Sequence, residues 1–239
     1  MSEGLSGSAA PEIGDDLLIL FPHGTRPTAR RVHGQCGTSG FADASGPDLT
    51  EYEHKVDIAA PTGLGLQRAG LVFDLVGLAP GPPIAVPDMG EEQAMREPIL
   101  PTRTEASSLR LGPHIVAGKG SLAILREWFG LASGLAETFG ATTLCWVPGG
   151  VVVPLDRLPH HLHAWDDRGD VPVNLLASFR RTLDGAVQSH GLAFFTGQEF
   201  RIEPPLVRGG EDALARLIFS HLFYAGEQTV TGELAAPDG

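Results

Sequence analysis

The chain has 239 residues, of which 42% are hydrophobic, enough to bury a substantial core in one large domain or two small ones. Its formal net charge of −12 excludes a nucleic-acid backbone as the expected partner. No apolar run approaches the length of a membrane-spanning helix, and the first residues lack the basic flank and apolar centre of a secretory signal.

The two cysteines, Cys36 and Cys145, lie far apart in the sequence. Such sparse thiols are typical of a reducing compartment, where they do not form disulfides. We therefore expect an acidic cytoplasmic protein without a cofactor.

The N-terminal part predicts one buried strand and a long loop. Residues 1–14 are small and polar, which predicts disorder. Asp16-Leu-Leu-Ile-Leu-Phe predicts a short buried strand. Residues 22–50 are rich in Gly, Thr, Ser and Arg without periodicity, which predicts a loop with one weak strand around Arg31.

The next segment predicts further strands. Residues 53–59 and 69–78 have strand patterns, and Pro80-Gly-Pro-Pro predicts a turn that makes residues 72–86 a hairpin. Residues 88–104 predict a polar connection with one helical turn at 91–95.

The clearest pattern lies between residues 108 and 155. Apolar residues there recur at steps of three and four, which predicts an amphipathic helix over 121–139: Leu122, Leu125, Phe129, Ala132, Ala136 and Phe139. Ser121 is the expected N-cap, its hydroxyl accepting from a first-turn amide, and Gly140 is the expected left-handed stop. The apolar runs at 109–117 and 141–147 predict two parallel strands joined by this helix, and Pro148-Gly-Gly predicts a hairpin to a strand at 151–155.

The C-terminal part predicts a loop, two strands and a helix. Residues 156–169 predict a polar loop, and residues 171–183 and 191–203 predict strands, the second with a break at Gly197. Asp184-Gly185 predicts a tight turn. Helical spacing returns over residues 211–225.

Smaller signals complete this part. Glu211 and Asp212 suit the first turn of the helix, Gly226 ends it, and residues 229–231 predict an edge strand. Because strands outnumber helices, we expect one α+β domain over residues 15–235, with a mainly antiparallel or mixed sheet and two principal helices.

Four pieces of sequence, in order, resemble one protein family. They are Leu71-Val-Phe-Asp-Leu-Val-Gly-Leu with Ile84-Ala-Val-Pro-Asp-Met; Pro113-His-Ile-Val-Ala; Leu144-Cys-Trp-Val with the Gly-Gly turn and Val-Val-Pro; and His190-Gly-Leu-Ala-Phe-Phe-Thr-Gly-Gln-Glu-Phe with the closing helix. Over about residues 55–235 the chain is similar to the bacterial domain-of-unknown-function family four-two-six-one. The resemblance implies an α+β domain in a bacterial cytosol and supplies no catalytic residues. Val147-Pro148 departs from the Gly that is more usual there, and the first fifty residues have no counterpart.

A histidine-rich segment is the candidate metal site. If residues 160–167 were extended, His161 and His163 would share a face and, with Asp166, would supply two imidazoles and a carboxylate. The alternative interpretation is a solvated loop, which Pro159 favours.

Cys145 is the candidate nucleophile, with His114 or His190 as its base. A cysteine in an apolar strand is more typical of a core residue, and activation would require exposure and a nearby cation. We therefore assign no catalytic residue.

Two further places are candidate binding sites. Lys119 and Ser121 stand in a glycine-rich turn before the long helix, whose amides would bind an anion, although the spacing of known phosphate-binding motifs is missing. Glu199 stands at a strand irregularity, where bulges redirect side chains. Arg26, Arg30 and Arg31 form a local basic group that could pair with an acidic partner or with the chain's own carboxylates, and we expect the second.

Two functions remain open from the sequence. The first is a non-enzymatic binding or adaptor protein, immunity-like in that it blocks a protein partner, because acidic charge speeds association with basic targets. The second is a small metal- or thiol-dependent hydrolase or transferase that uses the histidine–aspartate segment at 160–170 or Cys145.

Overall fold

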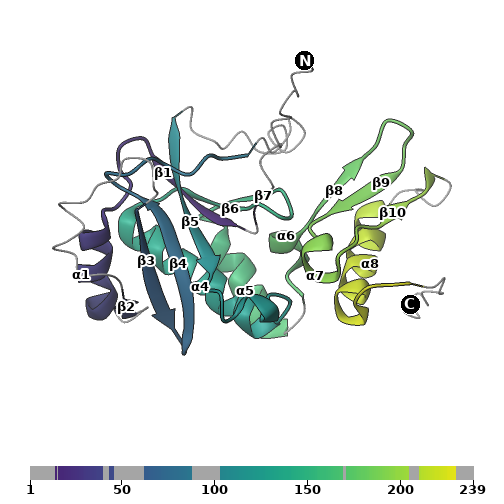
Figure 1. Cartoon of the computed structure of the whole chain (residues 1–239). Helices are drawn as coiled ribbons and strands as arrows, with labels where there is room; N and C mark the ends of the chain where they lie inside the picture. Colours follow the sequence, from purple (N-terminus) through teal and green to yellow (C-terminus); the bar gives the residue numbers. More distant parts are fainter. Residues whose placement is uncertain are drawn as a thin grey trace, which may run out of the picture.

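The computed structural model describes residues 14, 16–39, 43–45, 62–87, 103–168, 171–204 and 210–229. Two antiparallel sheets and their helices form the α+β fold that the sequence predicts. We call residues 17–168 the main lobe and residues 173–225 the C-terminal lobe. Figure 1 shows them side by side, with the C-terminal lobe on the right.

A seven-stranded sheet in the order β2-β3-β4-β5-β1-β6-β7 forms the main lobe, and every neighbouring pair is antiparallel. Its strands are β1 (Leu17–Pro22), β2 (Asp43–Ser45), β3 (Thr62–Arg68), β4 (Leu71–Leu78), β5 (Thr104–Leu111), β6 (Thr143–Trp146) and β7 (Val151–Pro154). The predicted first strand is confirmed as β1, which lies between β5 and β6. Its odd-numbered residues pack in the main core and Leu18 and Leu20 pack on the opposite face, which explains its continuous apolar run.

The predicted long helix is confirmed as α4 (Leu122–Phe139), which packs on β1, β5 and β6. Since β5 and β6 are each antiparallel to β1, they run parallel to one another, as predicted, with β1 between them. Ser121 is the N-cap but makes no side-chain capping hydrogen bond, so that detail of the prediction was wrong. Gly140 ends the helix in the left-handed conformation, and β6 and β7 form the predicted hairpin.

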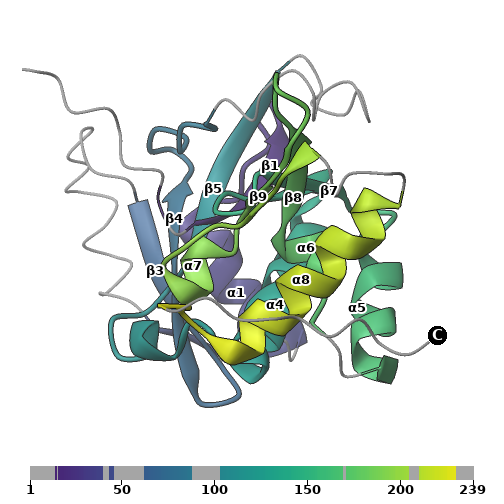
Figure 2. The ribbon, with the colours of Figure 1, turned by 90° about the vertical axis from the view of Figure 1, so that its right-hand side faces the viewer.

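Among the described residues, a three-stranded sheet, ordered β10-β9-β8, and three α-helices form the C-terminal lobe. Its elements are α6 (Val173–Leu176), β8 (Ser178–Arg181), β9 (Val187–His190), α7 (Ala193–Thr196), β10 (Arg201–Ile202) and α8 (Glu211–Ala225). The predicted helix at 211–225 is confirmed as α8, and the Asp184–Gly185 turn joins β8 to β9. Figure 2 shows α8 running diagonally across this lobe.

The two lobes meet at Trp146. Its indole Nε1 donates to the carbonyl oxygen of Leu176 at 3.1 Å, and its ring centroid lies 4.9 Å from that of Phe194 on α7. Ser178 Oγ donates to the carbonyl oxygen of Gly149 at 2.6 Å, which ties β8 to the β6–β7 turn. One hydrophobic core therefore includes residues from both lobes.

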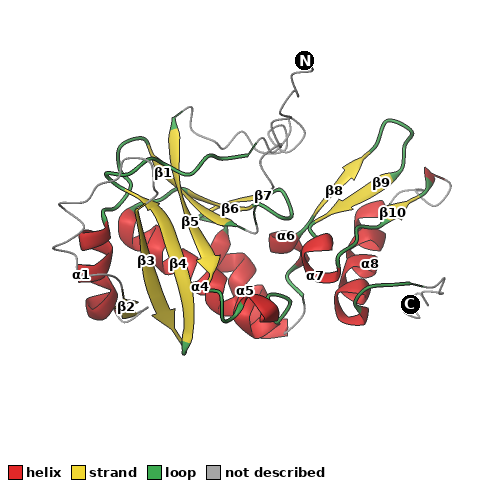
Figure 3. Ribbon diagram, in the orientation of Figure 1, coloured by secondary structure: helices red, strands yellow, loops and turns green. Residues whose placement is uncertain are grey.

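Two helices replace predicted loops. Within residues 22–50, the structure places α1 (Ala29–Ser39), so both the loop and the weak strand around Arg31 were wrong. Residues 158–168 form α5 (Leu158–Arg168) instead of a polar loop. Figure 3 shows both helices in red beside the main sheet.

Several strand predictions were wrong in detail. The strand predicted over 109–117 ends at Leu111, because residues 116–118 form the 3-10 helix η1 (Val116–Gly118). The segment 171–183 begins as α6, and 191–203 contains α7, whose C-cap is Gly197 in the left-handed conformation.

The hairpin of β4 was also predicted with the wrong partner. Strand β4 forms its hairpin with β3, and Ala69 and Gly70, which both have positive φ, make the turn. Ile84, which was expected to pair with β4, instead forms a bridge to Ala106 on β5. The predictions for residues 1–13, 53–59, 88–102 and 230–231 lie outside the described residues, and residue 229 belongs to no strand. The single-domain boundaries stay a prediction.

Candidate functional site

Lys119 lies where the two lobes meet. Its Nζ is 4.3 Å from the ring centroid of Phe194, a cation–π contact between residues 75 positions apart. Both residues line a hollow of about 340 Å³ that Asp16 and Arg110 also line. Arg110 holds Asp16 through two hydrogen bonds, of 2.7 Å and 3.0 Å. The predicted binding residue Lys119 thus borders a hollow, whereas Ser121 is exposed at the start of α4.

Glu199 caps the short helix α7 with its carboxylate. Its Oε1 accepts from the amides of Gly191 at 2.7 Å and Ala193 at 3.1 Å. Its Oε2 accepts from Ser189 Oγ at 2.5 Å and from the amide of Leu192 at 3.3 Å. A carboxylate is well suited to this place because the first amides of a helix have no partner within the helix. Glu199 therefore holds the turn between β9 and α7, and its predicted role in ligand binding stays a prediction.

His161 and His163 of α5 do not share a face. Because the segment is helical, side chains two residues apart point in directions that differ by about 200°. The metal prediction assumed that this segment is extended, and that assumption was wrong. His161 is half-buried and lines a cavity, whereas His163 is exposed. The side chain of Asp166 lies outside the described side chains. The side chains that the structure describes contain no group of three potential metal ligands.

Cys145 lies in the core, fully buried on β6 between Leu18 and Val152. Burial raises the pKa of its thiol to about 12, so it is protonated at neutral pH and unsuited to nucleophilic attack. Neither of the two candidate bases lies on β6 with Cys145. His114 is exposed in the turn after β5, and His190 ends β9 in the other sheet, where burial lowers its pKa.

Arg26 pairs with the chain's own carboxylate, as expected. Its Nε donates to Glu105 at 2.7 Å, and its terminal nitrogens donate to the carbonyl oxygens of Gly77 and Gly81. The pKa of Glu105 is lowered, chiefly by this hydrogen bond from Arg26. Arg31 instead lies over the ring of Phe139, 5.4 Å from its centroid.

The turn between β8 and β9 was predicted, but the sequence interpretation did not single out its residues as a candidate binding element. We call residues 181–186 the hairpin tip; Leu183 at its apex is fully exposed. Thr182 Oγ1 donates to Asp184 at 2.5 Å and to the carbonyl oxygen of Ala186 at 3.1 Å, and Arg201 on β10 also pairs with Asp184. Hydrogen bonds from Thr182 and then Arg201 lower the pKa of Asp184 to about 2. The sequence signal was an apolar residue directly before Asp-Gly.

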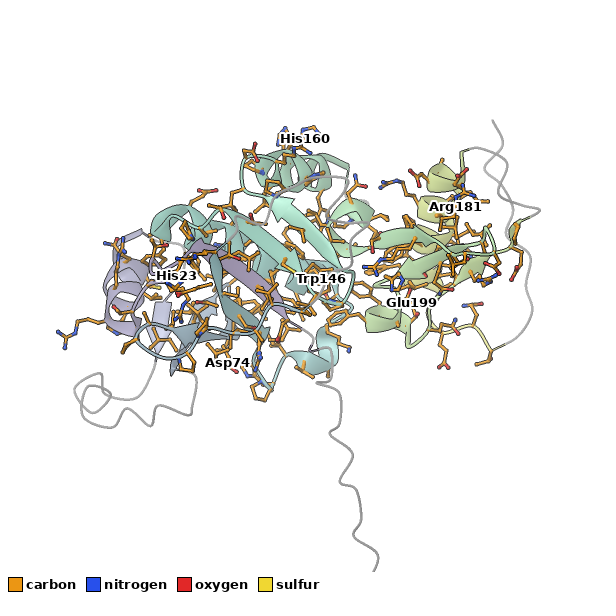
Figure 4. All side chains as sticks on the ribbon, turned by 90° about the horizontal axis from the view of Figure 1, so that it is seen from above. His23, Asp74, Trp146, His160, Arg181 and Glu199 are labelled. Carbon is orange, nitrogen blue, oxygen red and sulfur yellow. The ribbon has the colours of Figure 1, made fainter. Side chains whose placement is uncertain are left out.

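Figure 4 shows how these residues are distributed. Trp146 lies between the lobes, His160 lies on α5 at the edge of the main lobe, and Glu199 and Arg181 lie in the C-terminal lobe. His160 of the histidine-rich segment and Glu199 therefore lie in different parts of the molecule.

None of the helices that the structure describes is long and apolar enough to cross a bilayer. Comparison with protein-family models, with curated proteins and with solved structures finds no match for this chain. The resemblance to family four-two-six-one therefore stays a prediction.

Proposed function

We propose that this chain is a non-enzymatic, cytoplasmic binding protein that engages a protein partner through the hairpin tip. The observation that carries the proposal is the full exposure of Leu183 on a turn whose shape is fixed by side chains. A binding element that is already ordered loses less entropy when its partner arrives. Among the described residues, the other large apolar side chains that are exposed are Val116 and Tyr224, and both are less exposed than Leu183.

The charged side chains around the tip form ion pairs. Arg181 pairs with Glu211 on α8, and Arg201 pairs with Asp184 and Glu203. These pairs link β8, β10 and α8, so they support the base of the hairpin while Leu183 stays at its apex. A partner would therefore meet an apolar side chain on a support held by ion pairs.

The net charge of −12 suits a basic partner, because opposite charges speed the encounter of two proteins. An immunity-like role, in which the chain blocks another protein, is the form of binding that we propose. The resemblance to a bacterial family with no assigned activity is consistent with this role. Association of this kind would slow as salt is added.

Affinity capture with the tagged full-length chain tests the proposal. The bait would be wild type, Leu183→Asp or the matched control Val116→Asp, each in lysate from its native cell at low and high salt. We expect one stoichiometric basic partner with wild type and Val116→Asp, and its loss with Leu183→Asp. Substitutions at such exposed positions change stability little, so both variants should fold. Equal capture by all three baits would contradict the use of the tip. A protein that purifies with a tightly bound metal, and with no partner, would contradict the proposal as a whole.

A further inference from the structure

A cavity of about 410 Å³ lies between α5, α6 and α8, away from the hairpin tip. Its lining follows helical spacing: His161 and Trp165 are one turn apart on α5, and Arg216, Ser220 and Tyr224 are successive turns of α8. Asn174 of α6 completes the polar part of the wall. The volume is in the range that small-molecule sites in proteins occupy.

The polar side chains of this wall have unused hydrogen-bonding capacity. Within the described part of the chain, the side chains of Arg216, Asn174 and Ser220 make no hydrogen bond or ion pair with other residues. Together they offer a guanidinium, an amide and a hydroxyl as donors to a ligand. The planar guanidinium is the group that best matches the two oxygens of a carboxylate or phosphate.

Among the described residues that line the cavity, Arg216 carries a permanent positive charge, although the whole chain has a net charge of −12. The pKa of His161 is lowered first by burial and then by the nearby charges of His160, Arg157 and Arg216. His160 lies on α5, Arg157 directly precedes α5, and Arg216 lies on α8. Arg126 of α4 lies over the ring of Trp165, with its guanidinium carbon 5.6 Å from the ring centroid.

The floor of the cavity is a fixed part of the core. Trp165 is 3% exposed and packs edge-on against Phe129 of α4, with 6.5 Å between ring centroids. Leu175 is fully buried in the same core. The exposed ring of Tyr224 stands at the other side, where it can contact the apolar part of a ligand.

We propose that the cavity between α5, α6 and α8 binds a small organic anion, with its carboxylate or phosphate at Arg216 and its apolar body against Tyr224. This site is separate from the hairpin tip and does not depend on the proposed protein partner. Asn174 and Ser220 supply the further hydrogen bonds to the anionic head.

Phenyl phosphate is the probe for a direct test, with phenol as the neutral control. The isotope-labelled full-length protein is titrated at constant ionic strength, and the backbone amide signals are followed by NMR. We expect saturable shifts on α5, α6 and α8 with a dissociation constant of about 1 mM or tighter. Arg216→Gln should weaken binding about tenfold or more, because it removes a charged hydrogen bond. Arg103→Gln, which changes an exposed arginine outside the cavity, should bind like wild type.

Three results would overturn the proposal: equal affinity in Arg216→Gln and wild type, equally tight binding of phenol, or shifts confined to other parts of the chain. Circular dichroism of Arg216→Gln shows whether that variant is folded. The Leu183→Asp variant should still bind phenyl phosphate normally, so failure at the hairpin tip and failure at the cavity are distinguishable.

Discussion

The carbonyl oxygen of Leu176 accepts a hydrogen bond from the indole Nε1 of Trp146 at 3.1 Å, and this contact joins the two lobes. The same oxygen is closely approached by the backbone of two glycines. A Cβ added at Gly149 or at Gly191 would lie 2.3 Å from it, far inside van der Waals contact. The joint therefore depends on three backbone segments that meet without side chains between them.

Substitution of Gly191 by Ala should destabilise the protein strongly. The added Cβ would collide with the carbonyl oxygen of Leu176. In addition, φ at this position is +110°, a value that residues other than glycine rarely adopt. We expect a loss of about 3 kcal/mol or more in the free energy of unfolding, measured by urea denaturation. Gly120→Ala is the matched control, since nothing lies near its Cβ position. Equal stability of the two variants would show that the backbone contact is not close in solution.

The helices could be predicted only where an apolar stripe was uninterrupted. In α4 and α8 it spans the whole element and glycine ends both helices. In α1 the buried stripe consists of Ala29, Val32 and Cys36 among residues of low helix propensity, so the pattern was too weak to recognise. In α5, Pro159 suggested a loop, but it occupies the first turn, where proline is tolerated.

The site residues could not be predicted from local pattern alone. Lys119 meets Phe194 because Phe194 of α7 packs on Trp146, at the joint between the two lobes. The cavity lining requires α5 to be a helix, and a segment taken as a loop gave no reason to pair His161 with Arg216. Glu199 was singled out as a carboxylate at a strand irregularity. The irregularity is a helix that this carboxylate caps.

Replacing Glu199 by Gln should destabilise the C-terminal lobe. An amide in place of the carboxylate loses the negative charge that faces three backbone amides, and its NH₂ group cannot accept from them. We expect a loss of about 2 to 3 kcal/mol in the free energy of unfolding. Glu203→Gln, at a 61% exposed side chain, should change it by no more than about 0.5 kcal/mol. Hydrogen exchange should rise at Gly191 and Ala193 in the first variant only; unchanged exchange there would contradict the capping role.

The thiol of Cys145 should resist alkylation in the folded protein. Burial both blocks access and raises its pKa to about 12, so almost no thiolate forms at pH 8. Mass spectrometry after iodoacetamide treatment should show modification only once urea unfolds the chain. Cys36, which is also buried, should behave in the same way. Rapid modification of Cys145 without denaturant would contradict this account and would support the hypothesis of a thiol-dependent hydrolase.

Stability should depend on Glu105 at acidic pH. Its pKa is lowered in the folded state, chiefly by the hydrogen bond from Arg26, relative to the ordinary value of 4.5. Its stabilising contribution is therefore complete above pH 4.5 and is lost as the pH falls through the lowered pKa. Glu105→Gln should lower stability at neutral pH and make the decline below pH 4.5 shallower than in wild type.

Glu127→Gln provides the comparison for that experiment, because Glu127 also pairs with an arginine, Arg68, but in a more exposed place. We expect this variant to be nearly as stable as wild type at neutral pH. If Glu105→Gln and wild type lost stability in parallel below pH 4.5, the pairing of Arg26 with Glu105 would not be the cause.

The most direct test of the binding function is the dissociation constant between the purified chain and the partner that it captures. Isothermal titration calorimetry would compare wild type with Leu183→Asp, and Val116→Asp would serve as the control. The hairpin-tip account predicts at least a tenfold weaker complex for Leu183→Asp, since an apolar contact becomes a buried charge, and no change for the control. Equal dissociation constants for wild type and Leu183→Asp would contradict it.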